Sequence, residues 1–189
     1  TPVASDCSAV TNALSGSAPG GFHRKRDHRV HMQGLAAFPG ADSRQRGAGG
    51  YGTDLRGTRV CTNDDRQSGL AFERAVFNVV FNNRDDHPKN FAWTMDSEGH
   101  WRLAPAYDVT FCEGPGGYHQ MDVSGEALDI SRRQLIALGE QEADLSTAQA
   151  GEIIDKVCEV ASGFRRVAEE RFQGEISTAA LGTIARRIA

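Results

Sequence analysis

The 189-residue sequence has no run of 18 apolar residues and no excess of positive charge. The missing run excludes an ordinary transmembrane helix, which needs about 20 consecutive apolar residues. The net charge of −4 provides no electrostatic attraction to nucleic acid or to an anionic membrane surface. We therefore expect neither membrane insertion nor direct nucleic-acid binding.

Cysteine is rare and widely spaced, and no two cysteines form a C-x-x-C pair. The sequence therefore predicts neither a zinc site nor a disulfide framework, and reduced thiols are typical of a cytoplasmic protein. The chain begins without a basic segment followed by an apolar core, so no signal peptide is expected. The four cysteines are Cys7, Cys61, Cys112 and Cys158.

What the sequence does contain is enough for one folded domain. A chain of this length can bury about 70% of its unfolded surface, and a hydrophobic fraction of 39% with 24% charged residues is ordinary. Residues 1–21 are rich in Ser, Ala, Gly and Thr and show no periodic apolar pattern, which predicts a loose N-terminal arm. The folded domain is predicted over residues 22–189.

Apolar periodicity predicts that this domain is mostly helical. The strongest pattern, between residues 70 and 80, places apolar side chains mostly on one helical face, and Asp64 or Asp65 can cap its start. Ser131 and Ser146 are each followed three positions later by Gln, which is the pattern of a capping box. Gly139 is expected to end the first of these two later helices.

Four further segments complete the expected secondary structure. Residues 30–38 could form a short helix, and the polar, Gly-rich residues 40–53 a loop. One helix is expected to carry the apolar residues between 153 and 167 on one side. Ser177 can cap a last helix.

Two short strands are predicted at 91–95 and 101–103, with a good turn over 96–99. A hairpin brings its two ends back together. Asn90 enters this hairpin and Asp108 lies just beyond its exit, so both can face one site although 18 positions separate them. The expected fold is thus mostly α with a small β-hairpin.

The segment around this hairpin contains residues suited to phosphoryl transfer. Asp85 and Asn90 have the spacing of the R-D-x-x-x-x-N loop of phosphotransferases, in which the Asp accepts the substrate hydroxyl's proton and the Asn holds magnesium. Because magnesium prefers carboxylate and amide oxygens, Asn90 and Asp108 are a plausible pair of ligands. Lys89 can lie beside the transferred phosphoryl group and offset its charge.

Neighbouring residues receive structural roles. Asp86 does not fit the five-residue spacing and can orient the loop instead. His87 is expected to fix the loop by a hydrogen bond rather than to bind a metal, since no second His stands at a metal-binding spacing. Tyr107 is expected to pack beneath the loop, and residues 114–117 to form a mobile turn or a substrate-facing loop.

Other interpretations of these residues stay open. The cluster can be a polar surface turn without chemistry. A metal-dependent phosphoesterase is a further alternative; it would use Asp85, Asp86, His87 and Asp108 and two metal ions about 4 Å apart. The basic residues between 22 and 29 form either a solvated turn or a phosphate-facing patch.

NNRDDHPKNF followed by WRLAPAYDVTF closely resembles the signature of HipA-like serine/threonine kinases, the toxins of bacterial toxin–antitoxin pairs. The resemblance covers residues 22–189 and is most specific over 76–111. It implies that Asp85 is the catalytic base and that Asn90 and Asp108 bind magnesium. His87 and Lys89 match the rest of the motif, which implies a place for His87 at the bound cofactor and for Lys89 in catalysis.

The resemblance also implies a fold, cofactors and partners. The fold is the mostly helical C-terminal lobe of a protein-kinase-like enzyme that uses ATP and Mg²⁺. The partners are a protein substrate, such as an aminoacyl-tRNA synthetase, and a DNA-binding antitoxin of helix-turn-helix type.

The sequence departs from the family in one respect. Nothing in it resembles the family's N-terminal lobe, which supplies the phosphate-gripping loop and a strand lysine, and only three of the 21 cationic residues are lysines. We therefore expect a chain that is inactive or incomplete without a separate N-lobe, or alternatively a non-catalytic binding module.

Overall fold

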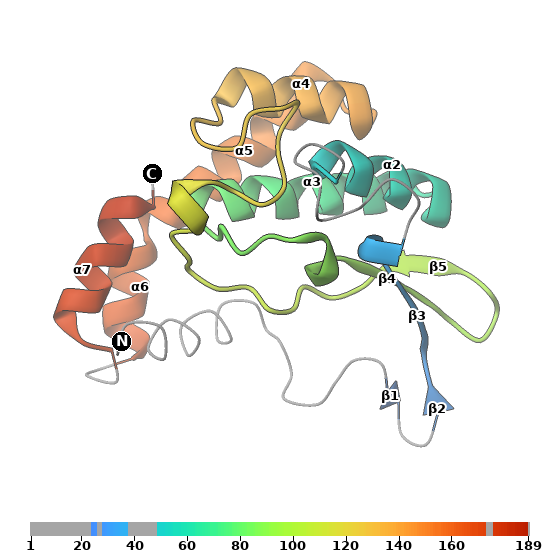
Figure 1. Ribbon diagram of the computed structural model, residues 1–189, viewed down its shortest axis with the longest axis horizontal. Helices are drawn as coiled ribbons and strands as arrows, with labels where there is room; N and C mark the ends of the chain where they lie inside the picture. The colour runs from blue at the N-terminus through green and yellow to red at the C-terminus, as the bar shows by residue number, and fades with distance from the viewer. Residues whose placement is uncertain (1–23, 26–27, 38–48, 173–175, 189) are drawn as a thin grey trace.

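The computed structural model describes residues 24–25, 28–37, 49–172 and 176–188 (Figure 1). The expected arm at 1–21 lies outside these residues. Helices account for most of the described chain, and they pack beside a small antiparallel sheet, which confirms the predicted fold class. The elements are β1 Arg24–Lys25, β2 His28–Arg29, β3 His31–Gly34, η1 Leu35–Ala37, α2 Tyr51–Thr62, α3 Asp65–Val80, η2 Pro88–Asn90, β4 Ala92–Met95, β5 Trp101–Leu103, η3 Pro115–Gly117, α4 Arg132–Glu142, α5 Thr147–Ser162, α6 Phe164–Arg171 and α7 Thr178–Arg187.

The predicted hairpin is present as β4 and β5, with Trp93 opposite Leu103. A third strand joins it, because β3 pairs antiparallel with β4 from His31 opposite Met95 to Gly34 opposite Ala92. The prediction of a helix over residues 30–38 is therefore wrong for its first part. Pairing with β4 supplies backbone hydrogen bonds that a local pattern does not reveal.

Helix α2 begins at Tyr51, inside the segment that was expected to be a loop up to residue 53. Gly50 gives no side-chain cap, so packing rather than capping stabilises this start. Tyr51 is fully buried, and Thr58 accepts a 3.0 Å hydrogen bond from Trp93 Nε1 of the sheet. Gly57 is needed for this contact, because a Cβ there would lie 2.9 Å from the Trp93 ring.

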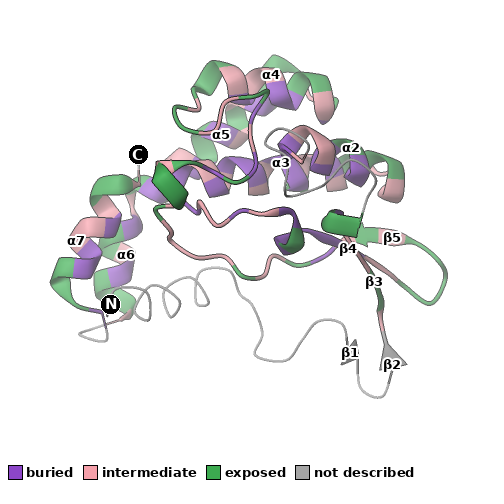
Figure 2. Ribbon diagram, in the orientation of Figure 1, coloured by how far each residue is buried: buried purple, intermediate pink, exposed green. Residues whose placement is uncertain are grey.

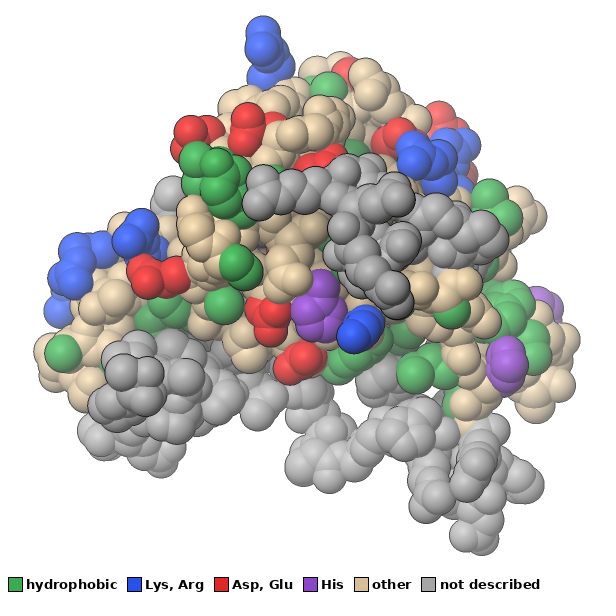
Figure 3. Space-filling view, in the orientation of Figure 1, with side chains coloured by type: hydrophobic (Ala, Val, Ile, Leu, Met, Phe, Trp, Pro, Cys, Tyr) green, Lys and Arg blue, Asp and Glu red, His purple; other side chains and the backbone are tan. Residues whose placement is uncertain are grey.

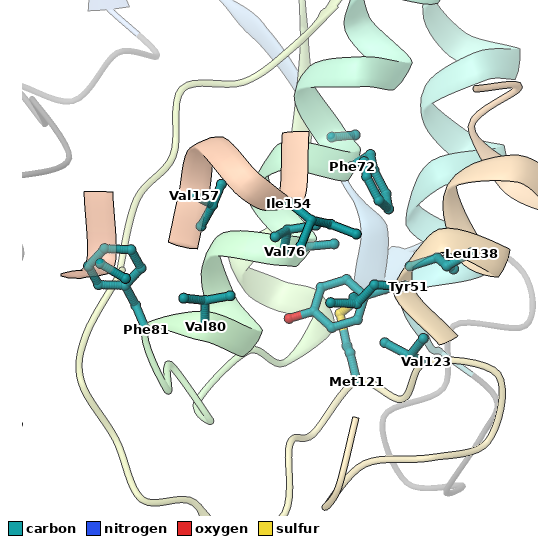
Figure 4. Close-up of a cluster of buried hydrophobic side chains, with 14 of the residues drawn as sticks. Tyr51, Phe72, Val76, Val80, Phe81, Met121, Val123, Leu138, Ile154 and Val157 are labelled. Atoms are coloured by element: carbon teal, nitrogen blue, oxygen red, sulfur yellow. The ribbon is translucent and has the colours of Figure 1, made fainter. Parts of the chain in front are cut away.

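Helix α3 forms the centre of the core. Asp64 caps it by accepting a hydrogen bond from the Arg66 backbone. Buried residues concentrate where α2, α3, α4 and α5 meet (Figure 2). Phe72 and Val76 of α3 lie among side chains of the other three helices (Figure 4). Leu70 was expected on this face but is exposed.

Both predicted capping boxes are present, at Ser131 and Ser146. Gly139 does not end α4 as expected but lies inside it. A Cβ at Gly139 would come within 3.0 Å of the Ala150 Cβ and 3.1 Å of the Phe72 ring, so this glycine allows α4 to approach α5 and α3 closely. The helix expected over 153–167 is two helices, α5 and α6, with Gly163 between them.

Ser177 caps α7 as predicted. No helix in the described part of the chain is long and apolar enough to cross a membrane. Cys61, Cys112 and Cys158 are free thiols, and Cys7 lies outside the described residues.

A carboxylate lies buried between α2 and α3. Asp54 is fully buried, and neither of its oxygens has a hydrogen-bond partner among the described residues. Burial raises the pKa of Asp54 from 3.8 to about 7, although the nearby Arg74 opposes this shift. Arg74 donates a 2.8 Å hydrogen bond to the Ala104 carbonyl.

Replacing Asp54 with asparagine is expected to flatten the pH dependence of stability. The pKa of Asp54 in the folded protein, about 7, exceeds the usual 3.8, so ionisation of this carboxyl lowers the free energy of unfolding. This loss grows as the pH rises between the two pKa values and is complete above pH 7. When the pH rises from about 5 to about 8, the free energy of unfolding should fall by about 2–3 kcal/mol more in the wild type than in Asp54→Asn. Urea unfolding at both pH values measures this. Asp129→Asn, at an exposed site, should behave like wild type; equal pH slopes in wild type and Asp54→Asn would refute the prediction.

Candidate active site

The loop from Asn82 to Asn90 begins where α3 ends. Asn83 is buried and donates through its side chain to Asn78 Oδ1 at 2.9 Å. The loop lies beside the segment after Asp108: Arg84 N donates to the Cys112 carbonyl at 3.2 Å, and Cys112 N donates to the Asn82 carbonyl at 3.1 Å. These bonds fix the start of the loop to a segment almost 30 residues later.

Asp86 anchors the middle of the loop in the protein interior. Its side chain is completely buried and accepts three hydrogen bonds: from Tyr51 Oη at 2.5 Å, His119 Nδ1 at 2.8 Å and the Gln120 backbone N–H at 2.8 Å. Burial, reinforced by the Asp86 charge, raises the pKa of Tyr51 well above its usual value. The phenol therefore stays protonated and donates a hydrogen bond to Asp86. His119 donates a hydrogen bond from its Nδ1–H to the carboxylate, because a carboxylate oxygen can only accept. Asp86 thus orients the loop, as the sequence suggested.

Asp85, unlike the buried Asp86, is accessible to solvent. Its side chain is 45% exposed. Oδ1 accepts a 2.7 Å hydrogen bond from Gln120 Nε2, and the Asp85 carbonyl accepts one from Asn90 Nδ2 at 2.9 Å. Asp85 and Asn90 are therefore held together, with the carboxylate accessible to a substrate.

Asn90 lies at the end of η2 and is buried. Its Nδ2 is used by the bond to Asp85, while Oδ1 makes no hydrogen bond within the described part of the chain. The side chain borders a small pocket that Asn83, Asp86 and Tyr107 also line. A free amide oxygen beside carboxylates suits a hard cation such as Mg²⁺.

Lys89 and Asp108 lie on the surface of the site. Lys89 is exposed, and its carbonyl accepts a 2.8 Å hydrogen bond from Tyr107 Oη, so Tyr107 packs against the loop as predicted. Asp108 follows Tyr107 and has a left-handed backbone, with φ of 53°. Among the described residues, no hydrogen bond or ion pair joins Asp108 to Asp85 or Asn90. The hairpin does bring its ends together, since Ala104 N donates to the Ala92 carbonyl at 2.8 Å.

Figure 3 shows acidic, histidine and basic side chains gathered near the middle of one face of the molecule. His87 does not fix the loop by a hydrogen bond as expected: its buried Nδ1 has no partner among the described residues, and Nε2 lies 3.9 Å from Asp85 Oδ1. His119 has that role. It lies 33 residues beyond Asp86 with no motif around it, so no local pattern indicates a role for either His119 or Gln120.

The geometry bears on the phosphoesterase alternative and on the turn at residues 114–117. No group of three or more His, Cys, Asp or Glu side chains able to hold a metal occurs within the described residues, so the donor set of a two-metal phosphoesterase finds no support there. Residues 115–117 form a short 3-10 helix, and Arg84 donates a hydrogen bond to the Gly117 carbonyl. This turn therefore lies against the loop that carries Asp85.

The arrangement provides a half-exposed carboxylate whose two neighbours, Gln120 and Asn90, fix its position. A carboxylate held in this way can accept a proton from a hydroxyl that approaches from solvent. The adjacent amide oxygen of Asn90 has the chemistry of a ligand for a divalent cation, while no contact among the described residues joins the exposed Asp108 to it.

A family model described as the HipA-like C-terminal domain matches residues 21–163. Among solved structures, the chain is similar to one in the toxin–antitoxin complex of HipA, HipB and operator DNA from Shewanella oneidensis MR-1, with a TM-score of 0.67 and 14% sequence identity. The match covers 91% of this chain but only 44% of that one, so the present chain spans less than half of its length. No curated protein sequence matches.

Proposed function

Because this chain belongs to the HipA-like C-terminal domain family, we propose that it is the C-terminal lobe of a kinase that phosphorylates Ser or Thr of a protein, using ATP and Mg²⁺. The observation that carries the proposal is the hydrogen-bonded unit of Asp85, Asn90 and Gln120 on a loop anchored by buried Asp86. In this unit the proposed base is both accessible and fixed, which catalysis by positioning requires.

In the proposed reaction Asp85 accepts the proton of the substrate hydroxyl. The hydroxyl oxygen forms a bond to the γ-phosphorus while the bond from that phosphorus to the β–γ bridging oxygen breaks, and ADP leaves with that oxygen. Lys89 is an exposed residue of the loop, where its charge can offset that of the phosphoryl group. His87 lies two positions after Asp85 in the motif, and its proposed place is at the bound ATP.

The residues present fit a magnesium ion, since Asn90 Oδ1 has no hydrogen-bond partner among the described residues. Asn90 and Asp108 would hold the ion. Bound there, it would neutralise charge on the ATP phosphates. Two hydrogen bonds support this assignment: Asn90 donates to the Asp85 carbonyl, and Tyr107, the neighbour of Asp108, donates to the Lys89 carbonyl.

The partners follow from the family and from the solved relative. That relative is bound to HipB and operator DNA, and we propose that this chain likewise works in the cytoplasm with a helix-turn-helix antitoxin. An aminoacyl-tRNA synthetase is the proposed kind of protein substrate. The chain spans 44% of its relative, and in this proposal a second lobe supplies the rest of the ATP site.

The test is phosphate transfer from labelled ATP to protein Ser or Thr, measured for the chain alone and for the chain completed by an N-lobe. We expect transfer only in the completed enzyme, and a fall to background when EDTA removes Mg²⁺, because charge neutralisation by the ion is essential to phosphoryl transfer. Restoring excess Mg²⁺ after EDTA is the control and should restore transfer. Silence under every condition would favour a non-catalytic binding module.

A further inference from the structure

A surface hollow of about 490 Å³ is lined by residues near the C-terminal end of the sequence, none of which belongs to the proposed active site. It falls within the range of about 300–1,000 Å³ that ligand pockets span. Its walls come from the C-terminal end of α5 and from α6 and α7, which lie together at one end of the molecule (Figure 1). The lining residues are Ala161, Ser162, Phe164, Arg165, Gly182, Ala185, Arg186 and Ile188.

Most of this lining lies beyond residue 163, where the match to the family model ends. None of the residues assigned to phosphoryl transfer contributes to it. The hollow therefore needs an explanation of its own, separate from the proposed kinase chemistry.

The charges around the hollow are mainly positive. Figure 3 shows basic side chains gathered at the end of the molecule where α6 and α7 lie. Arg165 is paired with Glu169 at 2.9 Å. Arg186 contacts only Thr183 Oγ1, at 3.3 Å, and has no acidic partner among the residues that the structure describes. One guanidinium at the hollow is thus available for an external anion.

The floor of the hollow is apolar. Phe164 is 5% exposed, and Ala161 is 7% exposed. Ala185 and Ile188 add further apolar surface from α7. Arg187 of α7 forms a 3.2 Å ion pair with Glu113, which holds this helix against the loop that follows the active-site hairpin.

We propose that this hollow binds an acidic segment of a partner protein through an apolar side chain. The side chain would fill the space over Phe164, and a neighbouring carboxylate would pair with Arg186. A polyphosphate or nucleic-acid backbone would satisfy the arginine but has no apolar group for the floor, and the net charge of −4 disfavours it. The proposal does not depend on kinase activity.

Binding of a short fluorescein-labelled peptide of alternating glutamate and leucine, followed by fluorescence polarisation, tests this. The peptide should bind the intact chain, while peptides with lysine in place of glutamate, or serine in place of leucine, should bind at least about tenfold more weakly. Arg186→Glu should weaken binding by about tenfold or more, because attraction becomes repulsion. Arg171→Glu is the matched control on exposed α6 surface outside the hollow and should change binding by less than about threefold.

A second variant fills the hollow without altering charge. Gly182 lies inside α7, and a Cβ there would meet only Arg186 Nη1, at 3.5 Å. Gly182→Leu should therefore fold, since leucine has the better helix propensity, yet it should weaken peptide binding by about tenfold. No binding of the acidic peptide at millimolar concentration, or equal effects of Arg186→Glu and Arg171→Glu, would overturn the proposal. The proposal would also be overturned if duplex DNA displaced the peptide from the wild-type chain and the Arg186→Glu variant no longer bound that DNA.

Discussion

Asp85→Asn is expected to lower the rate of phosphate transfer by the completed enzyme about 10²- to 10⁴-fold, the range that general base catalysis contributes. Asparagine keeps the shape of the side chain and can still accept from Gln120 Nε2, but it cannot take the proton of the substrate hydroxyl. Because the Asp85 side chain is 45% exposed and its buried neighbour Asp86 is unchanged, the fold should survive.

Initial rates with labelled ATP measure this effect, and thermal melting confirms the fold. Asp129→Asn is the matched control, since it removes one exposed carboxylate away from the described contacts of the loop. The control should retain the wild-type rate. If Asp85→Asn and wild type transfer phosphate equally fast, Asp85 is not the base.

Asp86→Ala is expected to destabilise the protein by about 3–5 kcal/mol. The substitution removes the acceptor of three hydrogen bonds in a completely buried position. The buried Tyr51 hydroxyl and His119 Nδ1, and the part-buried Gln120 N–H, then lose this acceptor, and a buried unpaired donor costs about 1–3 kcal/mol. For a domain of this size the melting temperature should fall by about 6–20 °C.

Urea unfolding and thermal melting give the two readouts. Tyr51→Phe is an informative partner variant, because it removes one donor and leaves the acceptor with two bonds, so its expected cost is only about 1 kcal/mol. A surface change such as Asp129→Ala should stay within about 0.5 kcal/mol of wild type. A loss below about 1 kcal/mol for Asp86→Ala would mean that the network does not stabilise the loop.

The features that the sequence predicted well depend on local signals. The hairpin of β4 and β5 has its strand and turn residues in adjacent positions, and the capping boxes at Ser131 and Ser146 each lie within four residues. Asp85 and Asn90 were likewise linked by a local signal, their five-residue spacing. In the structure one direct hydrogen bond joins them.

The features that it missed depend on contacts between distant segments. Helix α2 has few apolar residues and no capping side chain, and burial of Tyr51 against the rest of the core stabilises it. Strand β3 exists through its pairing with β4. A glycine at position 139 is typical of a helix end in sequence. The structure shows instead that the glycine allows close packing against Ala150 and Phe72. Secondary structure of this kind cannot be inferred from a short window.

The bonds to Asp86 also bear on how the protein is made. They join it to residues 33 to 35 positions away, before it in the chain at Tyr51 and after it at His119 and Gln120. Contacts across such separations form late, because closing the intervening chain costs entropy before any packing compensates. On the ribosome, the segment around Asp85 thus has no rigid frame until Gln120 has emerged, and a nascent chain that is interrupted earlier has the motif without its geometry.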